Sequence, residues 1–232
     1  MWTGVDARPA AVKNFVADSL ERLGVDCIDI HRPARLDPNV PIEETVGAIA
    51  VLVKQGYVKH SGLSEVGAET IRRARNRRRA ARVRGGNARP RDDDLRIFPA
   101  LGIRATLYGV YSRGLLTGSA PSSKCDYRKD LPRFTGERGA HNRVASDALR
   151  VFAEERSIPS AQVLVAWVLT KQPTLVPIGG ARNVSQVTDA IGALTRPLSQ
   201  DDVHALAGLS PAGAIQDDRY QTEPMRHLDS ER

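Results

Sequence analysis

The chain has 232 residues, of which 41% are hydrophobic, and a formal net charge of +7. This length and apolar content suit one globular domain with a substantial core. No stretch approaches the roughly 18 consecutive apolar residues of a transmembrane helix, and the N-terminus lacks the apolar core of a signal peptide. Two distant cysteines, Cys27 and Cys125, favour neither a disulfide framework nor a metal site. We therefore expect a soluble, cytoplasmic protein.

The first predicted helix spans residues 10–23. Apolar side chains recur on one face at helical spacing, and Gly24 follows as a stop signal. The residues of this face are Val12, Phe15, Val16, Leu20 and Leu23. Residues 1–9 carry no strand signal, so we expect a loop before the helix.

Residues 25–65 have the pattern of a strand, a helix and a second strand. The short apolar run at 27–30 predicts a buried strand, and Tyr57 to Leu63 resume an extended pattern. Between them, Pro41 suits a first helical turn and Gly56 a helix end. The apolar stripe of this helix comprises Ile42, Val46, Ile49, Ala50 and Val53. Because parallel strands need a crossover of about this length, the segment predicts an α/β sheet or barrel.

Residues 72–91 interrupt the pattern with ten arginines and almost no apolar side chain. Unpaired guanidinium groups are costly to bury, so we predict that residues 75–93 form no regular strand and lie on the surface. An out-of-frame reading of a GC-rich gene would also give such a composition. A third interpretation is a basic patch that contacts nucleic-acid phosphates. No aromatic residue is interleaved in the stretch, which disfavours a specific nucleic-acid function.

The second half of the chain predicts further alternating elements. Strands are expected at 103–110 and 174–178, and a long polar loop at 119–142. One helix follows that loop, and a nearly all-apolar helix at 161–169 has Ser160 as its expected cap. Ser199 and Asp202 have the spacing of a capping box for the last helix. Four strands are thus readable, and a fifth is expected to be lost in the arginine-rich stretch.

Four blocks of the chain resemble the aldo-keto reductase family. In order they are LGVDCIDI with RLDPNVPIEETVGAIAVLVKQGYVKHSGLSE, then LGIRATLYGVYSRGLLTG, TLVPIGGARNVSQVTDAIGAL and DRYQTEPM. The resemblance implies an incomplete (β/α)8 TIM barrel, formed by one partial domain over residues 1–232 with a non-matching arginine-rich segment at 75–93. The helix at 10–23 would be the third of the barrel, so the first three strands would be absent.

The resemblance also implies an oxidoreductase that reduces a small-molecule carbonyl substrate with NADP(H), with NAD(H) left open. The family's catalytic aspartate, tyrosine and lysine would fall in the absent strands. Counting without gaps places Ala34 at the position of the catalytic histidine, whereas the string IHRP nominates His31, three residues earlier. We favour Ala34, because a shift of three residues reverses the face of a strand. The resemblance therefore implies impaired catalysis in this chain.

Seven residues match the family's cofactor-binding positions. The resemblance places Ser64 and Glu65 at the nicotinamide carboxamide, Tyr108 against the nicotinamide ring, Ser112 and Arg113 in the pyrophosphate loop, and Gly180 and Arg182 at the adenosine phosphate. Two departures, Gln186 and Ala190, replace an arginine and an asparagine of many relatives. Ser64 as a helix N-cap and Tyr108 as an ordinary strand residue remain alternative interpretations.

The sequence is also compatible with two other functions. One is a non-catalytic fragment that at most binds a dinucleotide, and the other is a basic nucleic-acid-associated protein. A barrel that lacks strands also exposes unpaired backbone groups and apolar side chains, which predicts marginal stability or self-association.

Overall fold

The computed structural model describes residues 4–76, 83–85, 97–209 and 215. The chain divides into two compact units, Met1–Leu107 and Tyr108–Arg226. Each unit has its own hydrophobic core. The single domain expected from the sequence stays a prediction.

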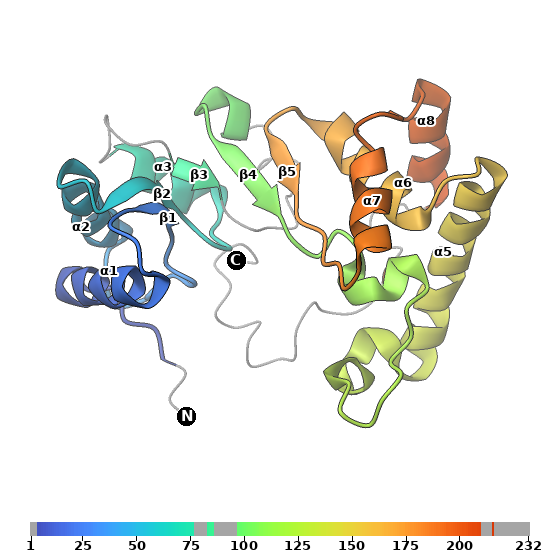
Figure 1. Cartoon of the computed structure of the whole chain (residues 1–232), viewed down its shortest axis with the longest axis horizontal. Helices are drawn as coiled ribbons and strands as arrows, with labels where there is room; N and C mark the ends of the chain where they lie inside the picture. The colour runs from blue at the N-terminus through green and yellow to red at the C-terminus, as the bar shows by residue number, and fades with distance from the viewer. Residues whose placement is uncertain (1–3, 77–82, 86–96, 210–214, 216–232) are drawn as a thin grey trace. The chain divides into compact units, whose positions relative to one another are not determined.

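The first unit contains a parallel sheet with helices between its strands (Figure 1). Within its described residues, the hydrogen-bonded strand order is β1 Ile28–His31, β2 Val58–Gly62, β3 Val83–Gly85 and β4 Arg104–Leu107. The helices of this unit include α1 Pro9–Leu23, α2 Ile42–Lys54 and α3 Ala68–Asn76. The predicted strand–helix–strand unit is therefore confirmed as β1, α2 and β2.

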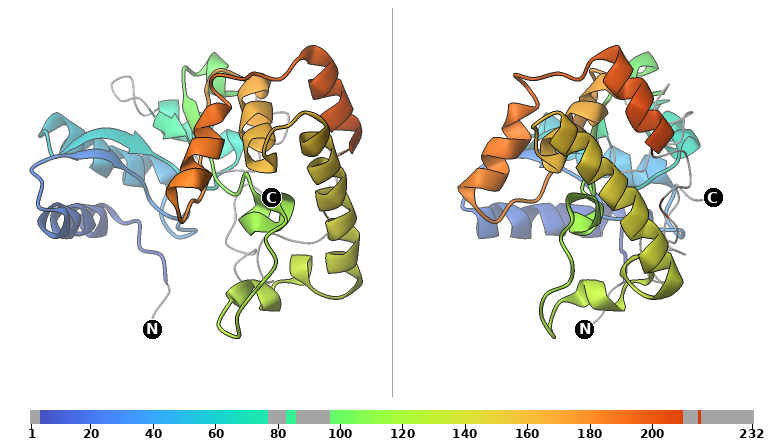
Figure 2. Two further views of the ribbon diagram at one scale, coloured as in Figure 1. Left: turned by 45° about the vertical axis from the view of Figure 1, so that its right-hand side comes forward. Right: turned by 90° about the vertical axis from the view of Figure 1, so that its right-hand side faces the viewer.

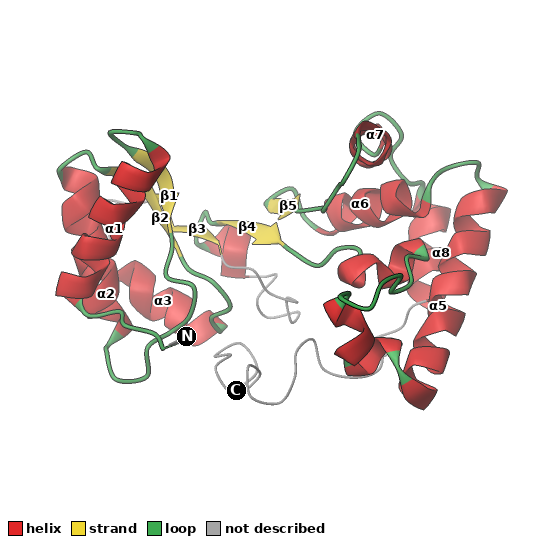
Figure 3. Cartoon of the chain, turned by 60° about the horizontal axis from the view of Figure 1, so that its bottom comes forward, coloured by secondary structure: helices red, strands yellow, loops and turns green. Residues whose placement is uncertain are grey.

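Helices α1 and α2 lie side by side and pack on the first two strands (Figure 3). The buried cluster that joins them comprises Val12, Val16, Ala48, Ile49, Leu52 and Val58. Burial of each valine, isoleucine or leucine side chain in this cluster contributes about 1.5–3 kcal/mol. The predicted apolar face of α1 is wider than the one it buries, because Phe15 and Leu23 remain 48% and 63% exposed.

Gly24 ends α1 as the sequence predicts. Its φ of 64° is left-handed, and its N–H donates to the carbonyls of Leu20 and Glu21. Val25 also donates to Leu20, which completes a Schellman-type end. The chain is thereby turned into β1 within four residues of the helix.

The prediction of no strand within residues 75–93 is wrong at residues 83–85. These residues form β3, which pairs in parallel with β2 on one side and with β4 on the other. Strand pairing uses backbone groups, and buried backbone groups of β2 and β4 need partners whatever side chains the intervening segment carries. Residues 77–82 and 86–93 lie outside the described residues.

The second unit is mainly helical and contains the strand β5 Leu175–Pro177. Its helices are η1 Ser112–Thr117, η2 Tyr127–Asp130, η3 Pro132–Phe134, α5 Gly136–Glu155, α6 Ser160–Lys171, α7 Val184–Gly192 and α8 Gln200–Leu209. Figure 2 shows α5 as a long helix that approaches η3 at one end and α8 at the other. One core cluster forms where α5, α6 and α8 meet, around Phe152, Val163 and Leu206.

Two boundaries in this unit differ from the sequence-based prediction. The loop expected at 119–142 is shorter, because α5 begins at Gly136 and two short 3-10 helices precede it. Gly139 permits this start, since a Cβ there would lie 2.5 Å from the backbone of Phe134. Ser160 is the first residue of α6 rather than its cap; the preceding Pro159 is the N-cap. The predicted capping box of α8 is confirmed: Ser199 Oγ accepts from Asp202 N, and Asp202 Oδ2 accepts from Ser199 N.

Several apolar side chains remain exposed on α7 and directly after its end. Val184, Val187, Ile191 and Leu194 are 81%, 44%, 55% and 69% exposed, at helical spacing.

In the first unit, β1 pairs only with β2 among the described strands. Over the described residues, no helix combines the length and the apolar character needed to cross a membrane.

Candidate cofactor site

His31 is the last residue of β1, and its Cα is in register with that of Ser61 on β2. The imidazole is half-buried, and this burial lowers the pKa of His31 below its ordinary value. The ring is therefore neutral at neutral pH and offers one donor and one acceptor. The structure thus gives His31 the chemistry of a neutral hydrogen-bonding group, and its catalytic role stays a prediction.

Glu65 lies just beyond the carboxyl end of β2 and is almost completely buried. Its side chain is 2% exposed, and its backbone has a left-handed φ of 53°. The guanidinium of Arg35, from the loop after β1, forms a 2.6 Å ion pair with the carboxylate. The preceding Ser64 is half-buried and is not the N-cap of α3, which begins at Ala68. The alternative interpretation of Ser64 as a helix cap is therefore wrong.

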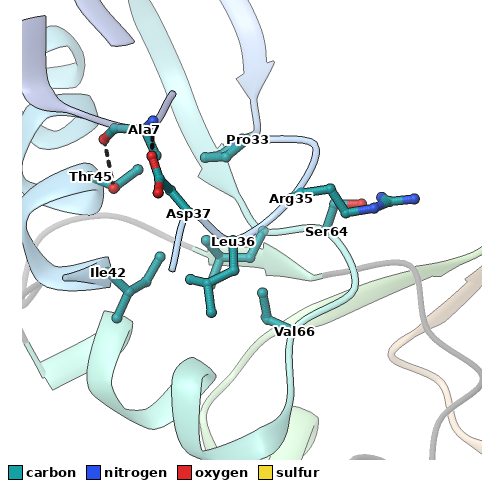
Figure 4. Close-up of a pocket in the computed structure, with 10 residues that line it drawn as sticks. Ala7, Pro33, Arg35, Leu36, Asp37, Ile42, Thr45, Ser64 and Val66 are labelled. Atoms are coloured by element: carbon teal, nitrogen blue, oxygen red, sulfur yellow. Dashed lines mark hydrogen bonds between the residues drawn. The ribbon is translucent and has the colours of Figure 1, made fainter. Parts of the chain in front are cut away.

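A small pocket lies beside this ion pair (Figure 4). Its lining comprises Ala7, Pro33, Arg35, Leu36, Asp37, Ile42, Thr45, Leu63, Ser64 and Val66. Two hydrogen bonds of Ala7 hold the segment before α1 against the pocket. The N–H of Ala7 donates to Asp37 Oδ2 at 3.0 Å, and its carbonyl accepts from Thr45 Oγ1 at 2.8 Å. Figure 4 shows the guanidinium of Arg35 pointing away from the apolar side chains. The recess is therefore largely apolar.

In the second unit, three consecutive residues adopt left-handed backbone conformations. They are Ser112, Arg113 and Gly114, with φ of 46°, 58° and 91°. For residues with a Cβ, such conformations cost about 1–3 kcal/mol each and persist only when neighbouring contacts hold them. Gly114 has no alternative, because a Cβ there would lie 2.9 Å from the Cβ of Ser119. The predicted pyrophosphate residues Ser112 and Arg113 thus lie in a strained turn.

Arg128 holds this turn in place. Its Nη1 donates to the carbonyls of Arg113 and Ser119, at 3.0 and 3.2 Å, and its Nη2 donates to the carbonyl of Ala120 at 3.1 Å. Asp126 neutralises the guanidinium through a 2.7 Å contact, and this contact holds the pKa of the Asp126 carboxyl well below its usual value. The pair therefore stays ionised at neutral pH.

A second arginine contacts the same turn from η3. Arg133 Nη1 donates to Ser112 Oγ at 3.2 Å. The carbonyl of Arg133 accepts from the fully buried Asn142 of α5 at 3.1 Å, which fixes the short helix against α5. Arg113 itself extends toward Tyr127, with its guanidinium 5.9 Å from the ring centroid. Tyr108, the first residue after β4, is half-buried, and its contact with a nicotinamide stays a prediction.

The loop between β5 and α7 approaches Tyr111 very closely. A Cβ on Gly179 would lie 2.6 Å from the Tyr111 hydroxyl, so only glycine fits there. This hydroxyl is buried without a hydrogen-bond partner among the described residues. Burial raises the pKa of Tyr111, with a smaller contribution from the negative charge of Asp189. The tyrosine and the glycine together fix the start of the loop.

Gly180 and Arg182 follow in this loop, and both are exposed. Asn183 caps α7 by accepting from Gln186 N at 3.0 Å. Gln186 Oε1 in turn accepts from Arg182 N at 2.7 Å. Gln186 therefore has a capping role, which explains this departure in structural terms. A capped helix N-terminus beside an exposed arginine is a favourable place for an anion.

Sequence reasoning missed the residues that hold the candidate site residues in place. Arg35, Asp126 and Arg128 have no motif of their own, and Arg128 reaches carbonyls eight to fifteen residues away in sequence. The only sequence feature that indicates the Asp126–Arg128 ion pair is the spacing of these two residues within a long polar loop. Local ion pairs of this kind are common on protein surfaces, so the spacing alone does not indicate a functional site. Three of the missed contacts, all from Arg128, satisfy carbonyls, which no side-chain pattern reveals.

The parallel strands, the intervening helices and the loops after them define an α/β protein of the TIM-barrel type. A model of the aldo-keto reductase family matches residues 1–211. The chain is 34% identical to aldo-keto reductase str7 of Strobilurus tenacellus over 93% of its own length and 68% of that relative. It is 32% identical to the Glycine max protein named "Probable aldo-keto reductase 1" over 93% of its own length and 64% of that relative.

Among solved structures, the glycerol dehydrogenase of Gluconobacter oxydans superposes with a TM-score of 0.78 at 26% identity, covering 92% of this chain and 67% of that one. The chain belongs to the aldo-keto reductase family. It spans about two thirds of the length of these relatives. These matches confirm the predicted family and fold type. Aldo-keto reductases are oxidoreductases that act on small carbonyl compounds with a nicotinamide cofactor.

Proposed function

We propose that this chain binds NADP(H) and belongs to an enzyme that reduces small carbonyl compounds by hydride transfer. The observation that carries the proposal is the left-handed turn Ser112–Gly114, which occupies a block matching the family's pyrophosphate loop and is fixed by Arg128 and Arg133. The N–H groups of Ser112 and Gly114 donate to the carbonyls of Gly109 and Tyr111, so the turn would contact the pyrophosphate through its side chains rather than through these N–H groups. The exposed Arg182 at the start of α7 supports a phosphate contact and favours NADP(H) over NAD(H).

The remaining roles follow from the family resemblance. Tyr108 would stack on the nicotinamide ring, while Ser64 and Glu65 would bind its carboxamide. When bound, the cofactor supplies the hydride, and the chain's own residues bind and orient it. Ala34 stands at the expected histidine position, so we include in the proposal that this chain by itself binds the cofactor better than it catalyses the reaction. Binding of NADP(H) is therefore the property that distinguishes this proposal from a nucleic-acid-binding function.

The binding proposal is tested by titrating the chain with NADPH and following the cofactor's fluorescence. We expect NADPH to bind more tightly than NADH, because only NADPH carries the additional phosphate. Arg128→Met should weaken NADPH binding by about tenfold or more, because it removes hydrogen bonds to three carbonyls that hold the turn.

Two controls make this titration specific. Binding of adenosine 2′-monophosphate should change little in Arg128→Met, since its only phosphate would contact the α7 end rather than the turn. Arg150→Met removes an exposed ion pair on α5 and should leave both ligands unaffected. Tight binding of duplex DNA together with no binding of NADPH would refute the proposal in favour of a nucleic-acid function.

Self-association is a further part of the proposal. The apolar surface of α7 and the single-sided pairing of β1 both favour contacts between chains. We expect the sedimentation coefficient of the isolated chain to rise with concentration, and the double substitution Val187→Lys and Ile191→Lys to suppress that rise. Val51→Lys, at a 44% exposed position on α2, is the matched control. A monomer at all concentrations with a sharp melt at high temperature would contradict this expectation.

A further inference from the structure

Two arginines in the loop after β1 differ in how their charges are compensated. Arg32 and Arg35 are both half-buried, whereas the other arginines with a described side chain in the first unit are exposed. The carboxylate of the buried Glu65 neutralises Arg35 at 2.6 Å. Within the described part of the chain, Arg32 forms a hydrogen bond to a neutral acceptor rather than an ion pair: its Nη1 donates to Thr106 Oγ1 at 3.0 Å.

The bond to Thr106 fixes the position of the Arg32 guanidinium. Arg32 directly follows the last residue of β1, and Thr106 is the penultimate residue of β4, 74 residues further along the chain. The charge is thereby held near the carboxyl ends of two parallel strands rather than extended into solvent. Ligands of barrel proteins bind at this end of the sheet.

A half-buried guanidinium with one neutral acceptor is incompletely satisfied. Arginine has five N–H donors in a planar fork, and this fork matches the two oxygens of a carboxylate. Partial removal of a charge from water is costly unless an opposite charge compensates it. Arg35 receives that compensation from Glu65, whereas no described residue compensates Arg32, so the compensating group is expected from a ligand.

We propose that Arg32 binds the carboxylate of the substrate, and that the preferred substrates are carbonyl compounds bearing a carboxylate group. This assignment of substrate class rests on the proposed carbonyl-reducing function. The same oxyanion chemistry is offered by a phosphate of the dinucleotide, so the test must separate the two sources.

The test compares two product analogues of nearly the same shape, the anionic 4-(hydroxymethyl)benzoate and the neutral 4-(hydroxymethyl)benzamide. These alcohols avoid the reaction of aldehydes with lysine side chains, and ligand-observed NMR titration gives their dissociation constants without turnover. The unmodified chain should bind the benzoate about tenfold more tightly than the benzamide. Arg32→Met should abolish that preference, whereas Arg32→Lys should retain part of it because the positive charge remains.

Two further variants and one further ligand complete the experiment. Thr106→Val removes the acceptor that anchors Arg32 and should reduce the preference, while Arg22→Met, at an exposed site on α1, should not. Circular dichroism melts of each variant show whether it is folded. NADP+ binding should be unchanged in Arg32→Met.

The outcomes separate the proposals. Equal binding of the two analogues by the unmodified chain, or a benzoate preference that survives Arg32→Met in a folded protein, overturns the assignment. Weaker NADP+ binding in Arg32→Met with an unchanged benzoate preference identifies the anion as a cofactor phosphate and likewise overturns it. A failure of NADPH to bind the unmodified chain would instead refute the proposed function, whatever the analogues show.

Discussion

The isolated chain is expected to reduce aldehydes far more slowly than a complete aldo-keto reductase. Hydride transfer to a carbonyl carbon builds negative charge on the oxygen, so a positioned proton donor is needed. In the family that donor is a tyrosine activated by a lysine, and neither position matches a residue of this chain. The loss of general acid catalysis lowers a rate by about 10² to 10⁴-fold. Cofactor binding without ordinary turnover is therefore the expected behaviour.

The described tyrosines support this expectation. Tyr57 and Tyr127 are 48% and 60% exposed, and burial raises the pKa of Tyr111, which makes it a weaker acid. The measurement is NADPH oxidation with 4-nitrobenzaldehyde, with Tyr108→Phe as the control. Rates typical of the family that survive this control would contradict the prediction. The His31→Gln variant would then show whether the neutral imidazole at the end of β1 is the donor.

Arg35→Met is expected to destabilise the first unit by about 3 kcal/mol, because it removes the guanidinium that lies 2.6 Å from the buried Glu65 carboxylate. The effect exceeds that of a surface ion pair because the Glu65 side chain is only 2% exposed. Urea unfolding followed by circular dichroism measures the loss. Adding Glu65→Gln to Arg35→Met should recover much of the stability, since a neutral amide is less costly to bury than a carboxylate that has lost this ion pair.

The matched control is Arg73→Met. Arg73 also forms a close ion pair, with Glu43 at 2.8 Å, but its side chain is 48% exposed. Removing an exposed pair should cost less than about 1 kcal/mol. Equal losses in Arg35→Met and Arg73→Met would show that burial of Glu65 does not determine the stability of this unit.

The fold was largely predictable because local patterns and tertiary packing agree along most of the chain. Helix α1 shows this agreement, with buried Val12 and Val16 on its apolar face and Gly24 in the left-handed conformation that ends it. Strand β3 shows the opposite case. Its formation depends on the backbone edges of β2 and β4, which are distant in sequence, so no local composition of residues 83–85 indicates it.

The candidate site was predictable only in part. The family resemblance predicts Ser112, Arg113 and Arg182 as cofactor contacts, because they lie within matching blocks, and this role stays a prediction. The side chains that hold those blocks in place were not identified, since Arg128 acts on carbonyls and Arg32 reaches across the sheet to Thr106. Contacts of this kind depend on the folded path of the chain and leave no periodic signal in the sequence.

Hydrogen–deuterium exchange with and without NADP+ tests cofactor binding and its location in one measurement. Binding at the proposed residues should slow exchange at 108–119 and at 179–187, the segments that contain the left-handed turn and the start of α7. Exchange in α1, which lies outside the proposed contacts, should not change. The account is contradicted if NADP+ leaves both segments unprotected at saturating concentration, or if protection is confined to residues 72–91.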